Sequence, residues 1–377
     1  MEPGGEQLCD MSKLRFAIVG CGVIHDTHVH AIQALSGDAE LVAVCDEAPE
    51  RAASVAEKHG VKPFTDLSAM LDWGAFDVLC LCVPSGLHAA CGILGARAGK
   101  HLVCEKPIDV SLENADALIR ACEENNVKLE VISQHRHAPG FRQLKTWLDE
   151  GKLGDLVYGE SVTKWYRTQA YYDSGGWRGT WALDGGGALM NQGVHYADML
   201  RWLMGPVKSV SATMGMLAHE RIEVEDIVSA TIEFQSGAVG TLLASTALFP
   251  GYKCSLEIYG THGTVLVDNS KVRHAHFAEG SEEQSMFGVK AGDPLIKDGL
   301  WTATGEPSDK GPVVHGAGDP SAVALGGHVA HFKDLIDCIR EDRQTYMNGT
   351  EARKALELVV GVYKSARNGG QRVSFPL

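Results

Sequence analysis

Residues 14–30 read LRFAIVGCGVIHDTHVH, and this stretch decides the fold that we expect. The largely apolar run at its start is typical of a strand that is covered by helices on both faces. It leads into Gly20-Cys21-Gly22, where a first glycine allows a tight turn and a second lets the backbone approach a pyrophosphate at the start of a helix. His25 takes the place of the third glycine of this fingerprint. The stretch therefore predicts a strand, a phosphate-binding turn and a helix.

A second apolar run, ELVAVCD at 40–46, ends in Asp46, which follows Gly20 by 26 residues. An acid at this position binds the ribose hydroxyls of the adenosine in dinucleotide-binding folds. No Arg or Ser follows Asp46 directly, which favours NAD over NADP as the cofactor. In the alternative interpretation, Asp46 caps a helix that begins near Pro49. The cofactor residues that we expect from this region are Gly20, Gly22, Val23, Ile24 and Asp46.

Short apolar runs alternate with helical patterns through residue 135. The expected strands are 14–20, 40–46, 76–83, 101–105 and 127–133, with helical patterns at 49–60 and 111–126. Strands that alternate with helices predict a doubly wound parallel sheet with right-handed crossovers. We therefore assign residues 12–135 to a Rossmann domain that binds NAD, so that the chain falls in the α/β class.

After about residue 150 the pattern changes to longer strands, several of which alternate apolar and polar residues. These strands are expected within 154–166, 207–217, 225–234, 238–248, 254–268 and 271–277. They predict a large, open, mainly antiparallel sheet with one face packed and the other either wet or covered by a partner. Residues 282–320 predict a long loop, and 321–341 and 350–367 predict two closing helices. We assign residues 136–377 to a C-terminal α+β domain for substrate binding and oligomerisation.

The composition excludes several classes of protein. The 377 residues suffice for two folded domains, and acidic side chains exceed basic ones by 14, which argues against binding to nucleic acid or anionic membranes. The N-terminus lacks the pattern of a signal peptide, and no apolar run approaches the ~20 residues of a membrane span. Ten scattered cysteines without a CxxC predict reduced thiols in a cytoplasmic protein. The 43 glycines gather partly at 175–193, where we expect the backbone to approach a ligand.

Three histidines, His25, His28 and His30, form an HxxHxH pattern that is similar to a metal-binding cluster. The spacing puts His25 and His28 near one another on the helix after the glycine turn. No Cys or acidic residue with ligand spacing accompanies them, and this helix end is where phosphate is expected. We therefore expect no metal site.

Two further segments carry candidate catalytic groups. The strand at 101–105 runs into Lys106 and Pro107, and ligands of a doubly wound sheet lie beyond the carboxyl ends of its strands. Lys106 is thus expected to face a nicotinamide, the alternative being a surface lysine in a turn. The helical pattern of 188–204 puts Asn191, His195 and Asp198 on one face. Such a set either lines a site or forms a buried hydrogen-bonded group.

With these segments taken together, the chain resembles the Gfo/Idh/MocA family (glucose–fructose oxidoreductase, inositol dehydrogenase and relatives). The resemblance spans nearly the whole chain and rests on GCGVI with His28 at 20–28, VPSGLH at 83–88, EKP at 105–107, GGGALMNQGVHYAD at 185–198, LEIYGTHGT at 256–264 and the ending at 349–370. It implies a Rossmann domain followed by a domain whose open sheet forms the interface of a homodimer or homotetramer.

The resemblance also implies roles for individual residues. Lys106 and His195 match the catalytic pair. The positions that match the surroundings of the dinucleotide are Gly20, Gly22, Asp46, Pro84, His88, Glu105 and Lys106. Gln134 and Arg136 fall where the segment after the sixth strand passes the nicotinamide, and Arg178 lies in a WR motif. We count Gln134 and Arg178 with the cofactor residues. The expected substrate residues are Arg136, Tyr166, Asn191 and His195.

One position departs from the family pattern. Inositol dehydrogenase-like members carry Asp four residues before the catalytic His, where this chain has Asn191. An amide orients an imidazole but does not stabilise its protonated form by charge. The NQG sequence resembles a branch that acts on sugars and sugar nucleotides, which puts a myo-inositol substrate in doubt.

We therefore expect an NAD-dependent dehydrogenase that transfers hydride between a secondary alcohol of a sugar, sugar derivative or cyclitol and the nicotinamide. His195 would act as acid and base and Lys106 would stabilise the alkoxide. The alternative is a glycosidase or lyase that oxidises a sugar transiently with no net redox, and a third hypothesis is a regulatory protein without turnover. An aromatic stretch either stacks on the sugar or packs an interface: Tyr166, Arg167, Tyr171, Tyr172, Trp177 and Trp181.

Overall fold

The computed structural model describes residues 12–251, 253–278 and 325–377, and its first sheet has six parallel strands. In spatial order these are β3 (Lys62–Phe64), β2 (Ala39–Cys45), β1 (Leu14–Val19), β4 (Val78–Leu81), β5 (His101–Cys104) and β6 (Leu129–Val131). The order is that of a dinucleotide-binding sheet, which confirms the predicted doubly wound fold. The sequence pattern missed only β3 among these strands, because three residues are too few to show a period.

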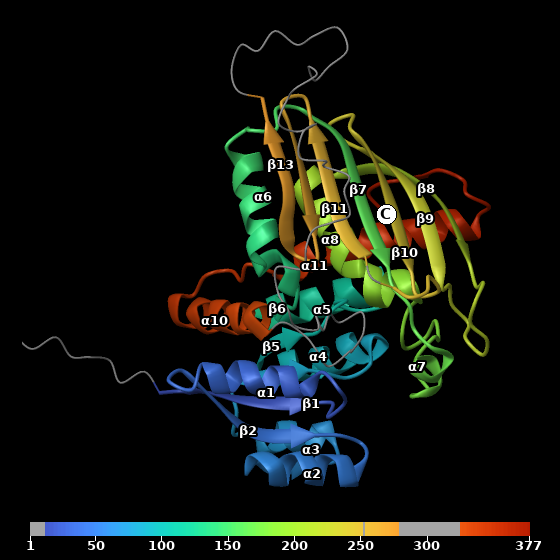
Figure 1. Cartoon of the computed structure of the whole chain (residues 1–377). Helices are drawn as coiled ribbons and strands as arrows, with labels where there is room; N and C mark the ends of the chain where they lie inside the picture. Colours follow the sequence, from blue (N-terminus) through green and yellow to red (C-terminus); the bar gives the residue numbers. More distant parts are fainter. Residues whose placement is uncertain (1–11, 252, 279–324) are drawn as a thin grey trace, which may run out of the picture.

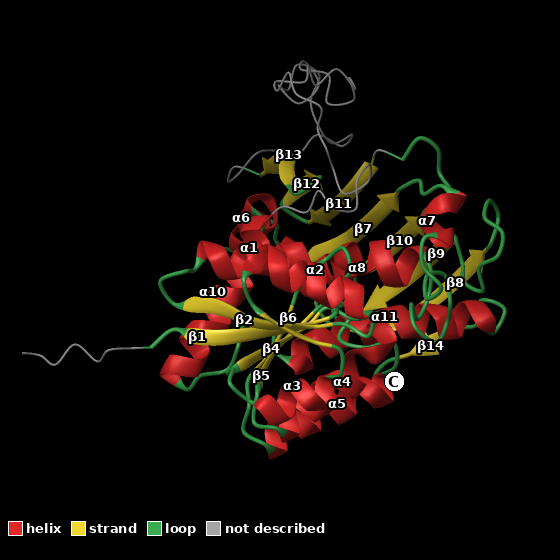
Figure 2. Cartoon of the chain, turned by 90° about the horizontal axis from the view of Figure 1, so that it is seen from below, coloured by secondary structure: helices red, strands yellow, loops and turns green. Residues whose placement is uncertain are grey.

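Helices cover both faces of this sheet (Figure 2). They are α1 (His25–Ala34), α2 (Pro49–His59), α3 (Leu67–Trp73), α4 (His88–Arg97) and α5 (Leu112–Glu124), with short turns η1 (Ser85–Leu87) and η2 (Gln134–His137). The central strand β4 is buried along its whole length, as expected for a strand with helices on both sides. Strand ends after β1, β5 and β6 all open at one edge, where a ligand binds in such folds.

The second sheet has eight strands, and neighbouring strands are antiparallel except β7 and β10. Its spatial order is β13 (Lys271–Phe277), β12 (Gly263–Asp268), β11 (Lys253–Gly260), β7 (Leu156–Lys164), β10 (Val239–Ser245), β9 (Ile227–Phe234), β8 (Val207–Gly215) and β14 (Val373–Ser374). This confirms the predicted large, mainly antiparallel sheet. The two-residue strand β14 was not predicted.

One face of the second sheet packs against α8 (Val194–Met204) and α11 (Gly349–Arg367) (Figure 1). Along β9, Val228, Ala230 and Ile232 are buried while Ser229 and Thr231 are exposed, so the predicted apolar–polar alternation is confirmed. The remaining helices of this part are α6 (Pro139–Asp149), α7 (Gln169–Asp173) and the π-helix η3 (Ala188–Gly193). Within the described part of the chain, no helix is long and apolar enough to cross a membrane.

The chain returns to the first sheet near its end. Helix α10 (Leu325–Glu341) places Phe332, Leu335 and Ile336 in the same buried cluster as Phe16 of β1, whose ring stacks on Phe332 with centroids 5.5 Å apart. A segment predicted within the C-terminal domain, 136–377, therefore helps to form the core of the N-terminal one. The predicted loop at 282–320 and the first residues of the helix predicted at 321–341 lie outside the described residues. The nine cysteines within the described ranges are free thiols.

Candidate active site

A cavity of about 1240 Å³ lies where the carboxyl edge of the first sheet meets the C-terminal domain. Residues that follow β1, β5 and β6 form one wall, and residues of η3, α8 and the second sheet form the other. The cavity is larger than the roughly 300–1,000 Å³ of a usual small-molecule site, so it has room for more than one ligand group. Six of the predicted site residues line it: Ile24, Glu105, Lys106, Gln134, Asn191 and His195.

Lys106 and His195 line this cavity together, and Asn191 joins their two elements. The Nζ atom of Lys106 donates a hydrogen bond to the backbone carbonyl of Asn191 over 2.9 Å. Burial lowers the pKa of Lys106, although the carboxylates of Glu105 and Asp184 act in the opposite direction. Burial also lowers the pKa of His195 well below its ordinary value, and the charge of Lys106 adds to this effect. The cavity thus offers a neutral imidazole that accepts a proton and an ammonium group that donates hydrogen bonds.

The segment with Asn191 and His195 is not one continuous α-helix, which corrects the helix expected over 188–204. Residues Ala188–Gly193 form a π-helix and the α-helix begins only at Val194. Single π-helical turns occur frequently at functional sites. The buried carboxylate of Glu225 holds the start of this segment, because its two oxygens accept hydrogen bonds from the backbone N–H groups of Gly187 and Leu189 at 2.8 Å each.

Asp198 does not line the large cavity with Asn191 and His195, and it follows the second predicted alternative, a buried hydrogen-bonded group. Its carboxylate accepts hydrogen bonds from Nε and Nη2 of Arg136, at 2.9 and 2.6 Å, and from the hydroxyl of Ser133 at 2.5 Å. Arg136, which we expected near the substrate, is 2% exposed and is not part of the cavity wall. The pair instead ties η2, which carries Gln134, to α8, which carries His195.

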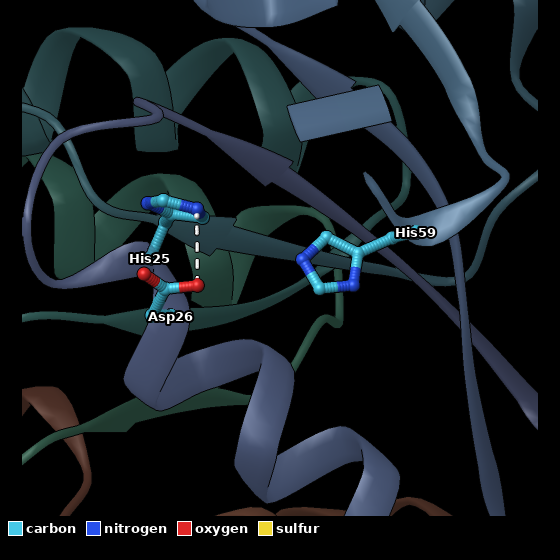
Figure 3. Close-up of side chains that lie close together, drawn as sticks. All are labelled: His25, Asp26 and His59. Carbon is cyan, nitrogen blue, oxygen red and sulfur yellow. Dashed lines mark ion pairs between the residues drawn. The ribbon is translucent and has the colours of Figure 1, made fainter. Parts of the chain in front are cut away.

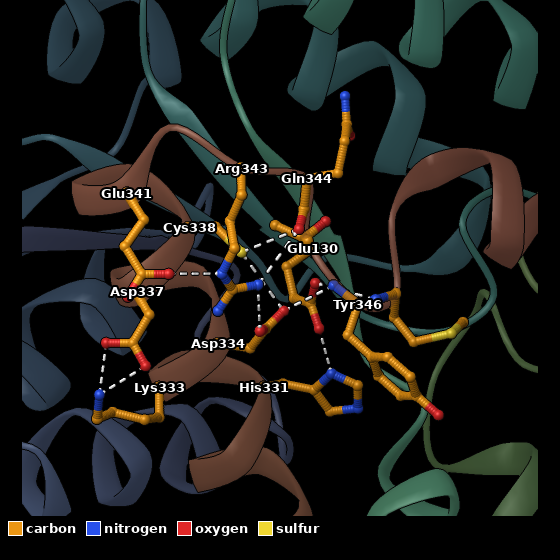
Figure 4. Close-up of polar contacts among 12 residues, drawn as sticks. Glu130, His331, Lys333, Asp334, Asp337, Cys338, Glu341, Arg343, Gln344 and Tyr346 are labelled. Atoms are coloured by element: carbon orange, nitrogen blue, oxygen red, sulfur yellow. Dashed lines mark hydrogen bonds and ion pairs between the residues drawn. The ribbon is translucent and has the colours of Figure 1, made fainter.

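A buried contact between a histidine of α10 and a glutamate of β6 supports the same region. Figure 4 shows His331 of α10 directed at Glu130 of β6, and both side chains are fully buried. The Nδ1 atom of His331 contacts Glu130, and its Nε2 atom accepts a hydrogen bond from the backbone N–H of Ser133 at 3.0 Å. Burial raises the pKa of Glu130. Helix α10 is therefore fixed to the strand end from which η2 departs.

The glycine turn after β1 has the shape that a dinucleotide needs. Gly20 has φ +93°, and a Cβ there would lie 2.5 Å from the backbone of Cys82, so only glycine fits. A Cβ at Gly22 would meet no atom within 4 Å, which leaves the backbone open to a pyrophosphate. Val23, also predicted for the cofactor, is exposed next to it, and Ile24 precedes α1. The residues of this turn therefore fit the predicted cofactor.

Asp46 lies beside this turn, and its carboxylate is already held by the protein. It accepts hydrogen bonds from the backbone N–H of Cys21 at 2.8 Å and of Ala48 at 2.9 Å, and Arg51 lies 3.2 Å away. The side chain of Asp46 does not cap α2, because the N-cap residue of that helix is Ala48. Arg51, five residues further on, was not considered from the sequence.

Two histidines of the HxxHxH pattern, His25 and His28, lie in separate groups, and each group contains an acid, which corrects the expectation that no acidic partner accompanies them. Glu105 Oε1 accepts hydrogen bonds from Nε2 of His28 at 2.9 Å and of His328 at 3.0 Å. These imidazoles hold the pKa of Glu105 well below its ordinary value. The Nε2 atoms of both histidines are therefore engaged with the carboxylate that precedes Lys106, while their Nδ1 atoms have no hydrogen-bond partner among the described residues.

The second group comprises His25, Asp26 and His59 (Figure 3). His25 Nε2 lies 3.5 Å from Asp26, and His25 Nδ1 contacts the carbonyl of Gly22 at 2.5 Å. The same Asp26 oxygen accepts a hydrogen bond from the ammonium group of Lys58 at 2.8 Å, so a cation already neutralises the acid. The absence of a metal site stays a prediction.

Four other predicted residues lie outside the cavity wall. Both ring nitrogens of His88 face backbone carbonyls, those of Pro107 at 2.7 Å and Val83 at 3.1 Å, so His88 braces the turn that includes Pro84 against the one after Lys106. Arg178 donates to the hydroxyl of Tyr171 at 2.8 Å and stacks on its ring. The ring of Tyr166 packs on Phe249.

Some residues of the aromatic stretch line the cavity, and others pack against neighbouring parts of the protein. Arg167 and Tyr171 line the cavity, whereas Tyr172 is buried and Trp181 packs on Tyr363. Pattern reasoning missed other residues of the wall, which come from the ends of β7 and β6 and from α6 and β13: Trp165, His135, His137, Gln143 and Lys271. His135 and His137 could have been found because they follow the predicted strand 127–133, whereas no sequence signal marked the other three residues.

Among the buried side-chain atoms on the wall that have no hydrogen-bond partner in the described part of the chain are two amide oxygens. These are Oε1 of Gln134 and Oε1 of Gln192. Such atoms are costly to bury, which indicates that a ligand with N–H or O–H groups satisfies them. Both the cofactor and a hydroxylated substrate carry such donors.

The fold and this site define a dinucleotide-dependent oxidoreductase, and comparisons with known proteins identify its family. Residues 14–133 match the model of the oxidoreductase family with an NAD-binding Rossmann fold, and residues 141–266 match the GFO/IDH/MocA C-terminal domain. The chain belongs to the Gfo/Idh/MocA family. It is an NAD-dependent oxidoreductase that acts on CH–OH groups, as the resemblance implied.

Relatives in this family act on sugars and cyclitols. The chain is 31% identical to inositol 2-dehydrogenase of Rhizobium meliloti over 274 residues, which is 71% of this chain and 79% of that one. It is 31% identical to D-glucoside 3-dehydrogenase of Escherichia coli over 69% of this chain and 80% of that one. Among solved structures, the WlbA dehydrogenase of Bordetella pertussis in complex with NADH and UDP-GlcNAcA is 34% identical, with a TM-score of 0.82 over 97% of this chain and 100% of that one.

Proposed function

We propose that this protein oxidises a secondary hydroxyl of a nucleotide-linked sugar, with Lys106 and His195 as the catalytic residues. The observation that carries the proposal is the joint exposure of these two groups in one cavity at the carboxyl edge of the dinucleotide-binding sheet. Bound NAD supplies a hydride acceptor at its nicotinamide. The residues that would hold it are those of the glycine turn, Asp46 and Gln134.

His195 takes the proton of the hydroxyl group. Its lowered pKa keeps the imidazole neutral at neutral pH, so that it is ready to accept this proton. Lys106 donates a hydrogen bond to the same oxygen and stabilises the negative charge that develops on it. The C–H bond breaks with both electrons leaving as hydride, the O–H proton moves to His195, and the substrate becomes a ketone.

The size and lining of the cavity support a substrate larger than a free monosaccharide. Its volume exceeds that of a usual small-molecule site, and basic groups of Arg167 and Lys271 lie on its wall. Basic groups suit a substrate with phosphate or carboxylate. The WlbA structures, which hold UDP-GlcNAcA, are 34% identical to this chain over nearly its whole length, whereas the levoglucosan dehydrogenase structure is 22% identical over a similar length. We therefore place a sugar nucleotide with a uronic acid first among candidate substrates.

A substrate panel tests this function. The enzyme is incubated with NAD and, separately, with UDP-GlcNAcA, with UDP-N-acetylglucosamine, which lacks the uronic carboxylate, with myo-inositol and with a D-glucoside, while formation of NADH is followed. We expect the highest kcat/KM with UDP-GlcNAcA. A higher value with the cyclitol or the glucoside contradicts the proposed substrate class. Product cleaved from a glycoside with no accumulation of NADH indicates the alternative chemistry, transient oxidation without net redox.

Two variants test the catalytic pair. We expect His195→Asn to lower kcat by roughly 10²- to 10⁴-fold. Lys106→Met should lower it by roughly 10²- to 10³-fold, because one donor to the developing alkoxide is lost. The exposed Lys62→Met on β3 serves as a matched control with wild-type turnover. Wild-type turnover in either catalytic variant refutes its assignment.

We also propose that the open face of the eight-stranded sheet joins subunits into a homodimer or homotetramer. Val157 of β7 and Val239 of β10 are each about half exposed on neighbouring strands of this sheet. Sedimentation of the wild type and of the double variant Val157→Lys with Val239→Lys tests the assembly. An assembled wild type together with a dissociated double variant supports this interface, and a monomeric wild type refutes it.

A further inference from the structure

Asp184 is a buried carboxylate next to the catalytic groups that the mechanism above does not use. It is 2% exposed and lies just before the run Gly185-Gly186-Gly187. Its Oδ2 atom accepts a hydrogen bond from the backbone N–H of Gly179 at 2.9 Å. Its Oδ1 atom accepts one from the side-chain amide of Asn191 at 2.7 Å. Both oxygens are therefore fixed, and one of them faces a residue of the cavity wall.

Asn191 extends this contact to the catalytic lysine. Its side chain lines the cavity, and its backbone carbonyl accepts the hydrogen bond from Lys106. A chain of two hydrogen bonds thus runs from the carboxylate of Asp184 through Asn191 to the ammonium group of Lys106. The charge of Asp184 also acts on Lys106 directly through space.

Burial raises the pKa of Asp184, while the Gly179 N–H, Asn191 and the charge of Lys106 counteract this rise. A buried acid surrounded by such donors and a cation has its ionised form stabilised by them. The arrangement places a negative charge one hydrogen bond away from position 191, where inositol dehydrogenase-like relatives have the charge itself.

We propose that Asp184 is a positioning residue of this active site, which acts through Asn191 to orient the amide and Lys106 toward the reacting hydroxyl and whose charge offsets that of Lys106. Asn191 and Asp184 together then replace a carboxylate at position 191. The proposal rests on the proposed function, since it assigns Lys106 and His195 their catalytic roles.

A charge exchange tests the proposal. Asp184→Asn keeps the shape and one acceptor for Asn191 but removes the charge, and we expect kcat to fall about ten- to a hundredfold while the Kd for NADH stays within about twofold. Asn191→Asp places two carboxylates in contact and should also lower kcat. The double variant, Asp184→Asn with Asn191→Asp, returns a single charge to the pair and should recover at least about tenfold over Asp184→Asn.

The control is Asp173→Asn, which removes an exposed carboxylate on α7 that pairs with Arg221. We expect it to retain wild-type kcat. A kcat of Asp184→Asn within about twofold of the wild type overturns the proposal. So does a double variant that is no better than the product of the two single effects, because two independent structural defects would simply add.

If Asp184→Asn does not fold, Asn191→Ala tests the chain of contacts with Asp184 in place, because it removes the side-chain contact with Asp184 and keeps the backbone carbonyl that accepts from Lys106. Rates are then expressed per site that binds NADH. A kcat about ten- to a hundredfold below that of the wild type supports the chain of contacts, and a kcat within about twofold of the wild type overturns it. The two tests fail in different ways. If the wild-type enzyme does not reduce NAD with any substrate of the panel, the proposed function is refuted. The ratios of kcat among the variants test only the role of Asp184.

Discussion

Glu225 anchors the segment that carries Asn191 and His195, and its titration gives a quantitative prediction. Its carboxylate is 2% exposed and receives hydrogen bonds from the N–H groups of Gly187 and Leu189 and from the hydroxyl of Tyr363. Burial is nevertheless the larger effect and raises the pKa of Glu225 from its ordinary 4.5 to about 7. The folded protein therefore holds a proton on Glu225 at pH values at which the unfolded chain has released it.

The sign follows from which state binds more protons. Between pH 4.5 and about 7 the folded state binds the extra proton, so the free energy of unfolding falls as the pH rises through this range. From about pH 5 to about pH 8 the loss from this one group is about 2.5 kcal/mol, at about 1.4 kcal/mol per pKa unit. An unfolding entropy of about 2.1 cal/mol/K per residue converts this energy, for the whole chain, to about 3 °C in Tm.

The variant Glu225→Gln cannot titrate, so the comparison isolates this group. We expect it to be less stable at about pH 5, because an amide has one acceptor oxygen, whereas both oxygens of the carboxyl group receive hydrogen bonds. The difference in Tm between wild type and variant should shrink by about 3 °C from about pH 5 to about pH 8. Thermal unfolding at several pH values measures it, with the exposed Glu220→Gln as control. A difference that stays constant or grows with pH refutes the reasoning.

Two further predictions concern the cofactor turn and the pH profile. Gly20→Ala should disrupt the turn and lower Tm, because the backbone at this position is left-handed and the added Cβ would meet Cys82. Gly22→Ala should keep the wild-type Tm but weaken NADH binding, since its methyl group enters the space left for the pyrophosphate. Thermal unfolding and fluorescence titration with NADH check both variants, and equal losses of Tm contradict the prediction. The pH profile of kcat/KM should be bell-shaped. Its acid limb should lie below pH 6.5 because the pKa of His195 is lowered, and its basic limb should lie below pH 10.5 because the pKa of Lys106 is lowered. An acid limb above pH 6.5 excludes His195 as the base.

The sequence allowed most of the fold to be predicted because long strands and helices repeat their pattern within one window. Buried parallel strands such as β4 are continuous apolar runs, and β9 alternates. The strands β3 and β14 have three and two residues and carry no such pattern. The packing of α10 on β1 was not predictable either, because periodicity shows that Phe332 lies on an apolar face but not which sheet this face meets.

The residues of the candidate site also divide into those that local sequence patterns predict and those that they do not. Lys106 was predictable because it follows a strand, and a doubly wound sheet gathers such residues at one edge. His328 and Glu225 could not be predicted, because they reach Glu105 and Gly187 over 223 and 38 residues of chain. Local spacing also led to one error, since it assumed a regular α-helix where a π-turn separates Asn191 from His195.

Asn191 shows why a departure from a family motif has to be judged with its neighbours. From the sequence, Asn in place of Asp removes a negative charge four residues before His195, the base that we propose. In the fold, the carboxylate of Asp184 lies 2.7 Å from the amide nitrogen of Asn191, so the charge stands one residue further from the cavity instead of being lost. The amide then presents both a donor and an acceptor within the site, whereas a carboxylate there would only accept. The substitution therefore changes the hydrogen-bonding character of the cavity wall, and with it the hydroxyl pattern that we expect the substrate to offer, more than it changes the charge balance around Lys106 and His195.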